Sequence, residues 1–232
     1  MKIKQRGNTY LKESEMEKTT SIVIAASLVL VIVISGVFIL TIPQVEPLQD
    51  LGEASDFVLA DQNNSTVTLD TYSGKVLLID FVYTECFIAE MCPLSSSQMR
   101  RVQNDLLGMG YGSQDFHFLS ISFDWEVDGP LEMMNYGEDY SANFTVWSFL
   151  SGTEEQISNV TDAYDIAVVY DSENSTPGFQ SLHIVAHTML LTVVDAAGHM
   201  RARHLTTMSE AWSVDLVTEQ VVQLILEARS TS

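Results

Sequence analysis

An uncharged, largely apolar stretch near the N-terminus dominates the hydropathy pattern of this 232-residue chain. No Asp, Glu, Lys or Arg occurs between Thr19 and Val45. Its core, SIVIAASLVLVIVISGVFILTI, is long enough, at about 1.5 Å per helical residue, to cross the ~30 Å hydrocarbon layer of a membrane. We therefore predict one transmembrane helix over residues 21–42, with the remainder of the chain divided between its two sides.

Basic residues flank this stretch on one side only. Lys and Arg are frequent before it, and the next basic residue along the chain is Lys75. Because positively charged flanks stay in the cytoplasm, residues 1–20 are predicted to form a cytoplasmic tail, and everything after Pro43 is predicted to lie outside the cell membrane. The apolar run lacks a small-residue cleavage site, which favours an uncleaved single-pass anchor over a removed signal peptide.

Sequons and charge agree with an extracytoplasmic domain. Asparagines with Ser or Thr two positions later occur at Asn63, Asn64, Asn143, Asn159 and Asn174. Such sequons accept glycans only in exported chains, although polar loops also produce them by chance. The formal net charge is −20, which argues against nucleic acid as a partner and is typical of a solubilising surface.

Residues 43–55, PQVEPLQDLGEAS, follow the apolar stretch. They contain two prolines and three acidic residues and show no usable periodicity, so we interpret them as a linker. The remaining residues 56–232 are enough for one domain with a substantial core.

Strand and helix patterns alternate along this domain. DFVLAD and STVTLDT flank a turn and predict an N-terminal hairpin. KVLLIDFVY, residues 75–83, is apolar and rich in β-branched and aromatic residues, which predicts a central strand. Further strands are predicted at residues 115–124, 188–195 and 199–205, and helices at residues 93–106, 131–136, 154–164 and from a capping box at Thr207 and Glu210 onward. This order predicts an α/β, thioredoxin-like domain with helices on both sides of a mixed central sheet.

The chain has two cysteines, and both follow the predicted central strand, in FVYTECFIAEMCPLSSSQM. Cys86 and Cys92 could form a disulfide, bind one soft metal ion or exchange electrons. In a thioredoxin-like domain, reactive cysteines lie at this turn from strand to helix. Cys92 precedes Pro93 at the predicted N-cap, where the positive end of the helix should lower the thiol pKa and favour thiolate. A structural disulfide is the rival interpretation, but it would stabilise little because the closed loop is short.

These residues resemble the Sco/SenC family, whose members are membrane-anchored, thioredoxin-fold copper proteins associated with cytochrome c oxidase assembly. The family's F-x-Y/F-T-x-C is similar to FVYTEC, and its C-P is similar to Cys92 with Pro93. Its S-x-D-P-x-x-D is similar to SFDWEVD, with Trp125 where proline is usual. Its tryptophan followed by L-T-G is similar to Trp147 with FLSG, and its late histidine is similar to His187. The resemblance covers most of residues 56–228.

The resemblance implies copper, as Cu(I) or Cu(II), bound by Cys86, Cys92 and His187. The chemistry agrees, because soft thiolates hold Cu(I) and an imidazole nitrogen tolerates Cu(II). For Asp124 and Asp128 the resemblance implies partner recognition, and capping of the next helix is the alternative. The sequence contains no HExxH motif, no calcium loop and no second pair of cysteines for structural zinc.

One departure from the family concerns the cysteine spacing. Five residues separate Cys86 from Cys92, where the family has three, and we interpret this as an insertion within the loop. The loop can still bring two cysteines to the separation that a disulfide or a shared metal ion requires. Met91 could add a thioether ligand or pack beneath the loop.

Two functions are predicted, and a third is disfavoured. The leading one is a membrane-anchored copper metallochaperone that delivers or prepares copper for cytochrome c oxidase, with the oxidase's copper-centre subunit or its assembly factors as partners. The alternative is an extracytoplasmic thiol-disulfide oxidoreductase in which Cys86 and Cys92 cycle between dithiol and disulfide to keep target cysteines reduced. A peroxide-reducing relative is disfavoured because no P-x-x-x-T-x-x-C precedes either cysteine.

Overall fold

The computed structural model describes Ser27 and residues 47–86, 88–89, 91–170, 184–206 and 211–231. The chain divides into two units, Met1–Pro47 and Leu48–Ser232. The predicted transmembrane helix at residues 21–42 and the predicted cytoplasmic tail lie outside the described residues, apart from Ser27. Within the part of the chain that the structure describes, none of the helices has the length and apolarity needed to cross a bilayer.

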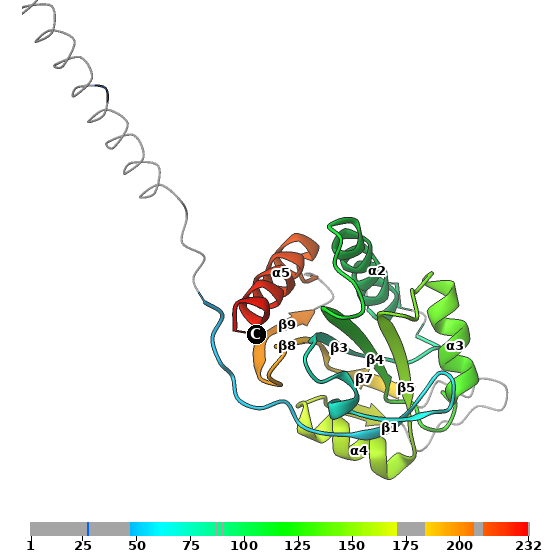
Figure 1. The fold of residues 1–232 in the computed structure, drawn as a ribbon. Coiled ribbons are helices and arrows are strands. Elements are labelled where there is room, and N and C mark those ends of the chain that lie inside the picture. Colours follow the sequence, from blue (N-terminus) through cyan, green and yellow to red (C-terminus); the bar gives the residue numbers. More distant parts are fainter. Residues whose placement is uncertain are drawn as a thin grey trace, which may run out of the picture. The chain divides into compact units, whose positions relative to one another are not determined.

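A seven-stranded mixed sheet forms the centre of the second unit (Figure 1). Its strand order is β2-β1-β5-β4-β3-β8-β9, in which β3, β4 and β5 run parallel and the other neighbours pair antiparallel. The predicted mixed sheet and N-terminal hairpin are thereby confirmed. The strands are β1 (Val58–Asp61), β2 (Thr66–Thr68), β3 (Val76–Val82), β4 (Phe116–Ser122), β5 (Trp147–Ser151), β8 (Met189–Val194) and β9 (Met200–Thr206).

The apolar composition of β3 explains its central place. Every residue of the strand is buried, as expected for a parallel strand covered on both faces. On one side Leu78 pairs with Phe118 of β4, and on the other it pairs with Val193 of β8. The C-terminal end of β3 therefore opens at the middle of the sheet, and the cysteine loop begins there.

Helices cover both faces of this sheet (Figure 1). They are α2 (Cys92–Gly108), α3 (Pro130–Asp139), α4 (Glu154–Ala163) and α5 (Val214–Thr231), with a short 3₁₀ helix, η1 (Leu69–Tyr72). On one face, Ser96 of α2 and Tyr136 of α3 share a hydrogen bond of 2.8 Å, and α5 lies beside α2. On the other face, Tyr164 at the end of α4 contacts Phe81 of β3, with ring centroids 5.8 Å apart.

Three strands were not predicted from the sequence. β5 is short and fully buried, and the alternation of apolar and polar residues in its sequence WSFLS breaks at Leu150, which leaves too little pattern to predict a strand. β6 (Val168–Tyr170) and β7 (Ile184–His187) form a separate two-stranded antiparallel sheet. Their pairing joins segments separated by residues 171–183, so it is decided by tertiary structure rather than by a local turn. At the other end of the chain, α5 begins at Val214, and the predicted capping box at Thr207 and Glu210 lies outside the described residues.

Part of the predicted linker belongs to the folded unit. The backbone N–H of Leu51 donates to the Met200 carbonyl at 2.9 Å, and the N–H of Met200 donates to the Gly52 carbonyl at 2.8 Å. The Arg201 guanidinium adds a hydrogen bond of 2.7 Å to the Leu48 carbonyl. Residues from Leu48 onward are therefore attached to β9, which corrects the predicted domain boundary at residue 56. Hydrogen bonds to the backbone of residues 48–52 do not require apolar side chains at regular intervals, so the sequence shows no periodic pattern there.

Candidate metal centre

The two cysteines lie at the end of β3 and at the start of α2. Cys86 follows the strand in a loop, and its backbone N–H donates to the Tyr83 carbonyl at 3.3 Å. Cys92 is the first residue of α2, and Met91 is the N-cap, one position earlier than the sequence predicts. Such a shift is within the usual uncertainty of a helix end. Both thiols are free and buried, with Cys86 8% exposed and Cys92 0% exposed.

The histidine comes from a distant part of the chain. His187 is the last residue of β7 and pairs with Val168 of β6. Its ring lies against two aromatic side chains that follow the neighbouring central strands. The centroid distance is 4.7 Å to Phe123, which comes after β4, and 5.6 Å to Tyr83, which comes after β3. These contacts limit the orientations that the imidazole can adopt.

The structure brings Cys86, Cys92 and His187 together. Their potential ligand atoms all lie within 4.8 Å of one another, and among the described residues they form the one group of this kind. The Cys92 Sγ to His187 Nε2 distance is 3.8 Å. Two ligands on one ion, each with a bond of about 2.0–2.3 Å, are themselves roughly 4 Å apart. The donor atoms are therefore arranged closely enough to share a single metal ion.

The thiols differ in acidity in the direction opposite to the prediction. A hydrogen bond from Cys92 lowers the pKa of Cys86 to about 4 against the opposing effect of burial, and His187 adds a further hydrogen bond. Burial raises the pKa of Cys92 well above its ordinary value, and the Cys86 thiolate raises it further. The two sulfurs thus share one proton, which Cys92 holds. The prediction that Cys92 is the thiolate is wrong because the helix terminus does not compensate for complete burial.

A buried carboxylate near the site was not predicted. Asp80 of β3 is 2% exposed and accepts hydrogen bonds from Ser120 Oγ at 2.6 Å and Ser95 Oγ at 3.3 Å. Burial raises the pKa of Asp80 to about 6, although both hydrogen bonds act in the opposite direction. Its signal in the sequence is a single charged residue inside the apolar run LLIDFV.

Asp124 and Asp128 do not lie on the surface. They are 0% and 2% exposed. The Asp128 carboxylate accepts hydrogen bonds from Ser122 Oγ at 2.6 Å and from the backbone N–H of Thr84 at 2.9 Å. Asp124 Oδ1 accepts a hydrogen bond of 3.3 Å from the Val127 N–H. In this conformation both side chains stabilise the loop between β4 and α3, so the expected direct recognition of a partner does not fit their burial.

The other candidate residues lie around or away from this group. Met91 is half-buried and packs against the core. His117 shares a hydrogen bond of 2.8 Å with Ser148. His199 contacts Asp50, and His204 contacts Gln220 at 2.7 Å. None of these histidines belongs to the group formed by the two cysteines and His187.

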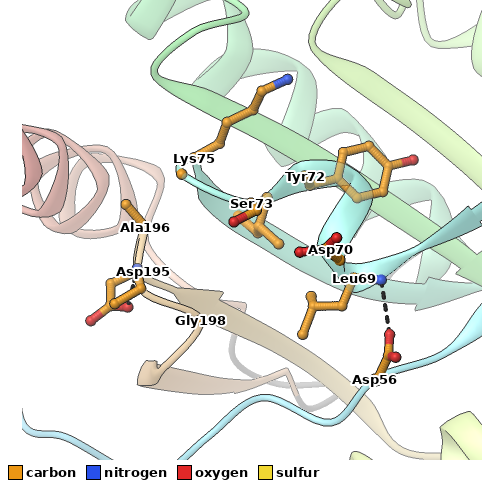
Figure 2. Close-up of a pocket in the computed structure, with 12 residues that line it drawn as sticks. Asp56, Leu69, Asp70, Tyr72, Ser73, Lys75, Asp195, Ala196 and Gly198 are labelled. Atoms are coloured by element: carbon orange, nitrogen blue, oxygen red, sulfur yellow. Dashed lines mark hydrogen bonds between the residues drawn. The ribbon is translucent and has the colours of Figure 1, made fainter.

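A hollow of about 220 Å³ lies elsewhere, where β3 begins (Figure 2). It is lined by η1, by Lys75 and by the turn between β8 and β9 that contains Asp195 and Gly198. Within it, Asp56 Oδ1 accepts a hydrogen bond of 3.0 Å from the Leu69 N–H. The hollow contains neither of the cysteines nor His187, so it is separate from the candidate metal centre.

Comparison with known proteins identifies the family. The model of the SCO1/SenC family matches residues 45–224. The chain belongs to this family. A curated Sco relative, the SCO1 protein homolog of Bacillus subtilis, is 30% identical over 100 residues, which cover 43% of this chain and 49% of the relative. The chain thus spans about half the length of that relative.

Solved Sco structures share the fold. BsSco, described as a member of the Sco family of cytochrome c oxidase assembly proteins with a disulfide switch, has a TM-score of 0.60 and 22% identity, covering 78% of this chain and 98% of BsSco. Arabidopsis thaliana ScoI, solved with copper bound, has a TM-score of 0.61 and 20% identity, covering 75% of this chain and 98% of ScoI. At these identities the likeness establishes a common thioredoxin-like architecture for this Sco protein.

Proposed function

We propose that this protein binds copper through Cys86, Cys92 and His187 and delivers or prepares it for the copper centre of cytochrome c oxidase. The observation that carries this proposal is the convergence of two sulfurs and one imidazole nitrogen within 4.8 Å. Membership of the SCO1/SenC family supports it. The copper found in the related ScoI structure supports the choice of metal.

The donor set suits copper as cargo in either oxidation state. Thiolate sulfur is a soft ligand that favours Cu(I), and imidazole nitrogen also accommodates Cu(II). Cys86 supplies a sulfur that is already deprotonated at neutral pH, since its pKa is about 4. Burial of both sulfurs limits access of water to the bound ion, while the half-buried His187 leaves one side of the site closer to solvent.

The proposal includes a location. Residues 21–42 would anchor the protein in the cell membrane, with residues 1–20 in the cytoplasm and the Sco domain outside. This placement would bring the copper site to the side of the membrane on which an oxidase subunit with an extracytoplasmic copper centre receives its metal. The partner would be that subunit or one of its assembly factors.

Copper titration tests the proposal. The full chain, purified in mild detergent and reduced without oxygen, is titrated with Cu(I) against a competing chelator and with Cu(II) while sulfur-to-copper absorption is followed. We expect one copper per chain, and binding at least about tenfold weaker in Cys86→Ser, Cys92→Ser and His187→Ala, because each loses one of three ligands. His204→Ala is the matched control, since that half-buried histidine lies on β9 and contacts Gln220 instead.

A thiol-disulfide oxidoreductase is the second candidate, and the proton shared by the two cysteines favours it. A thiolate with a lowered pKa beside a second thiol is the arrangement that such exchange uses. Two results together would favour the oxidoreductase over the metallochaperone. His187→Ala would bind copper as tightly as the parent, and the disulfide forms of both proteins would be reduced rapidly by a test dithiol. If the parent binds no copper, the metallochaperone proposal fails outright.

A further inference from the structure

Asp128 contacts the cysteine loop across a long interval of sequence. It lies in the loop between β4 and α3, 44 residues after Thr84, and it is 2% exposed. Its Oδ2 accepts the backbone N–H of Thr84 at 2.9 Å, and its Oδ1 accepts the Thr84 hydroxyl at 2.5 Å. One side chain therefore accepts hydrogen bonds from both donors, the backbone N–H and the hydroxyl, of the residue two positions before Cys86.

Asp128 is itself held firmly. Its backbone N–H donates to the Asp124 carbonyl at 2.9 Å. Its Oδ2 also accepts the Ser122 hydroxyl at 2.6 Å, and Ser122 Oγ in turn accepts the Asp124 N–H at 3.0 Å. Ser122 ends β4 and pairs in register with Val82 at the end of β3. The carboxylate is thus fixed to the same pair of central strands from which the cysteine loop departs.

The cysteine loop is supported from within mainly near its C-terminal end. The Met91 N–H donates to the Ile88 carbonyl at 3.0 Å, the Ser95 N–H donates to the Met91 carbonyl at 3.0 Å, and the backbone of Ile88 and Cys92 hydrogen-bonds to the Cys86 sulfur. At its start, the described backbone–backbone hydrogen bond is the one from the Cys86 N–H to the Tyr83 carbonyl, at 3.3 Å. Five residues separate the two cysteines, and a longer loop has more conformations to lose when its ends are fixed. The end of the loop is fixed by α2, so the position of Cys86 depends on how its beginning is fixed.

The segment that carries Asp128 also contacts the histidine. Phe123, five positions before Asp128, lies against the His187 ring with centroids 4.7 Å apart. The residues between β4 and α3 therefore touch both the part of the site that holds Cys86 and the part that holds His187. Loosening this segment would change the distance between sulfur and imidazole without removing a ligand.

We infer that Asp128 is a positioning residue, which clamps Thr84 and thereby sets the distance from Cys86 Sγ to the other two ligands; this inference rests on the copper site proposed above. It assigns Asp128 a role inside the protein instead of at a partner surface. Side chains that orient metal ligands without binding the metal commonly contribute about 10–100-fold to metal affinity.

The hydrogen-bonding pattern distinguishes a clamp from a charge effect. The Thr84 N–H can only donate, so Asp128 must offer an acceptor at Oδ2. An asparagine can keep that acceptor and direct its NH₂ group to the Thr84 hydroxyl, which then accepts instead of donating. If Asp128 acts as a clamp, copper affinity should be retained in Asp128→Asn and reduced in Asp128→Ala. If it acts through its negative charge, copper affinity should be reduced in both variants.

The experiment compares five full-length variants with the parent. Cu(I) affinity is measured by chelator competition, and the Cu(II)-thiolate absorption band is recorded. The equilibrium for forming the Cys86–Cys92 disulfide in a glutathione buffer is measured without metal. We expect Asp128→Ala and Thr84→Val to bind Cu(I) about 10–100-fold more weakly, to shift the absorption band and to form less disulfide. Asp128→Asn and Thr84→Ser should resemble the parent. Asp195→Ala is the control.

Asp195 is a matched residue away from the site. It is also largely buried, and it accepts the backbone N–H groups of Ala197 at 3.0 Å and His199 at 2.9 Å in the turn between β8 and β9. Asp195→Ala should lower stability without changing copper affinity. Should Asp128→Ala fail to fold, Thr84→Val decides the question, because it retains the backbone hydrogen bond and nearly the same shape.

Two results would overturn the inference. One is parental copper affinity and parental disulfide formation in both Asp128→Ala and Thr84→Val. The other is an Asp128→Asn variant as weak as Asp128→Ala, which would show that charge is what matters. If the parent itself binds no copper, the proposed function fails, whereas the disulfide equilibrium still tests the clamp.

Discussion

At Cys92, burial and the helix N-terminus have opposite effects on the thiol pKa: burial raises it and the helix N-terminus lowers it. A favourable charge at a helix terminus contributes about 0.3–1 kcal/mol at an exposed position, whereas removing a charge from water costs several kcal/mol. Cys92 is 0% exposed, so burial prevails and this thiol stays protonated. Cys86 can ionise because Cys92 and His187 donate hydrogen bonds to its sulfur. A motif that places a cysteine beside a helix start therefore does not by itself identify the thiolate.

His117 lies away from the metal centre and allows a separate test of how burial changes the pKa of a side chain. It is 6% exposed, its Nε2 contacts Ser148 Oγ at 2.8 Å, and its ring lies 4.7 Å from that of Tyr72. Burial lowers its pKa to about 3, with a smaller contribution from Lys75. The unfolded chain binds a proton near pH 6.5, so between pH 6.5 and 3 the unfolded state holds more protons than the folded one. This histidine therefore makes the free energy of unfolding fall with decreasing pH, by at most about 1.4 kcal/mol per pH unit.

Urea unfolding of the parent and of His117→Gln, at several pH values from 7.5 to about 4, measures this effect. Glutamine can keep a hydrogen bond to Ser148 and does not titrate. We expect the variant to be less stable at pH 7.5 and the difference from the parent to shrink as the pH falls below about 6.5. Buried carboxylates such as Asp80 are present in both proteins and cancel in the difference. A difference independent of pH would contradict the lowered pKa.

At the scale of elements, close packing restricts single positions within helices. Gly137 of α3 faces two aromatic side chains, and a Cβ built there would lie 2.7 Å from carbons of Phe144 and Phe149. Gly108, the last residue of α2, has nothing within 4 Å of the same added atom. The two glycines therefore provide opposite environments for the same substitution.

Alanine at each position tests this difference. Gly137→Ala should lower the free energy of unfolding by about 1–3 kcal/mol, because overpacking against Phe144 and Phe149 exceeds the gain in helix propensity. Gly108→Ala should be neutral or raise stability by up to about 1 kcal/mol. Denaturant midpoints and slopes of both variants, measured beside the parent, check the prediction. Equal effects of the two substitutions would show that α3 can move away from β5 without a loss in the free energy of unfolding.

The acidic charge acts on the molecule as a whole. With a net charge of −20, folding brings negative charges closer together, and salt screens their repulsion. Surface ion pairs such as Arg203 with Asp165 act in the opposite direction, but each contributes little. We expect the Tm to rise between about 10 mM and 500 mM NaCl. Thermal unfolding followed by circular dichroism measures this, with KCl as a check on ion specificity. An unchanged or lower Tm in salt would mean that local ion pairs outweigh the net charge.

The sequence predicted strong and local patterns well. β3 is an unbroken apolar run, and it is the buried central strand. The side chain of Thr153 caps the N-terminus of α4, and the predicted extent of this helix, residues 154–164, agrees with the observed residues 154–163. The short strands β5, β6 and β7 were missed because three to five residues carry too little periodicity. The attachment of residues 48–54 to β9 and to the turn before it was missed because hydrogen bonds to the backbone do not require a particular sequence pattern.

Family membership follows from the sequence alone, because the family's motifs are visible in the residue types and their order. The candidate ligands follow from the resemblance to that family, which selects His187 among the five histidines of the chain. Which sulfur ionises, and what holds it in place, follows only from the tertiary structure. Proton sharing between Cys86 and Cys92 depends on burial and on separations of a few ångströms. The contact between Asp128 and Thr84 depends on two parallel strands ending side by side. Distances across a sheet are set by the packing of the entire domain, so no short stretch of sequence contains them.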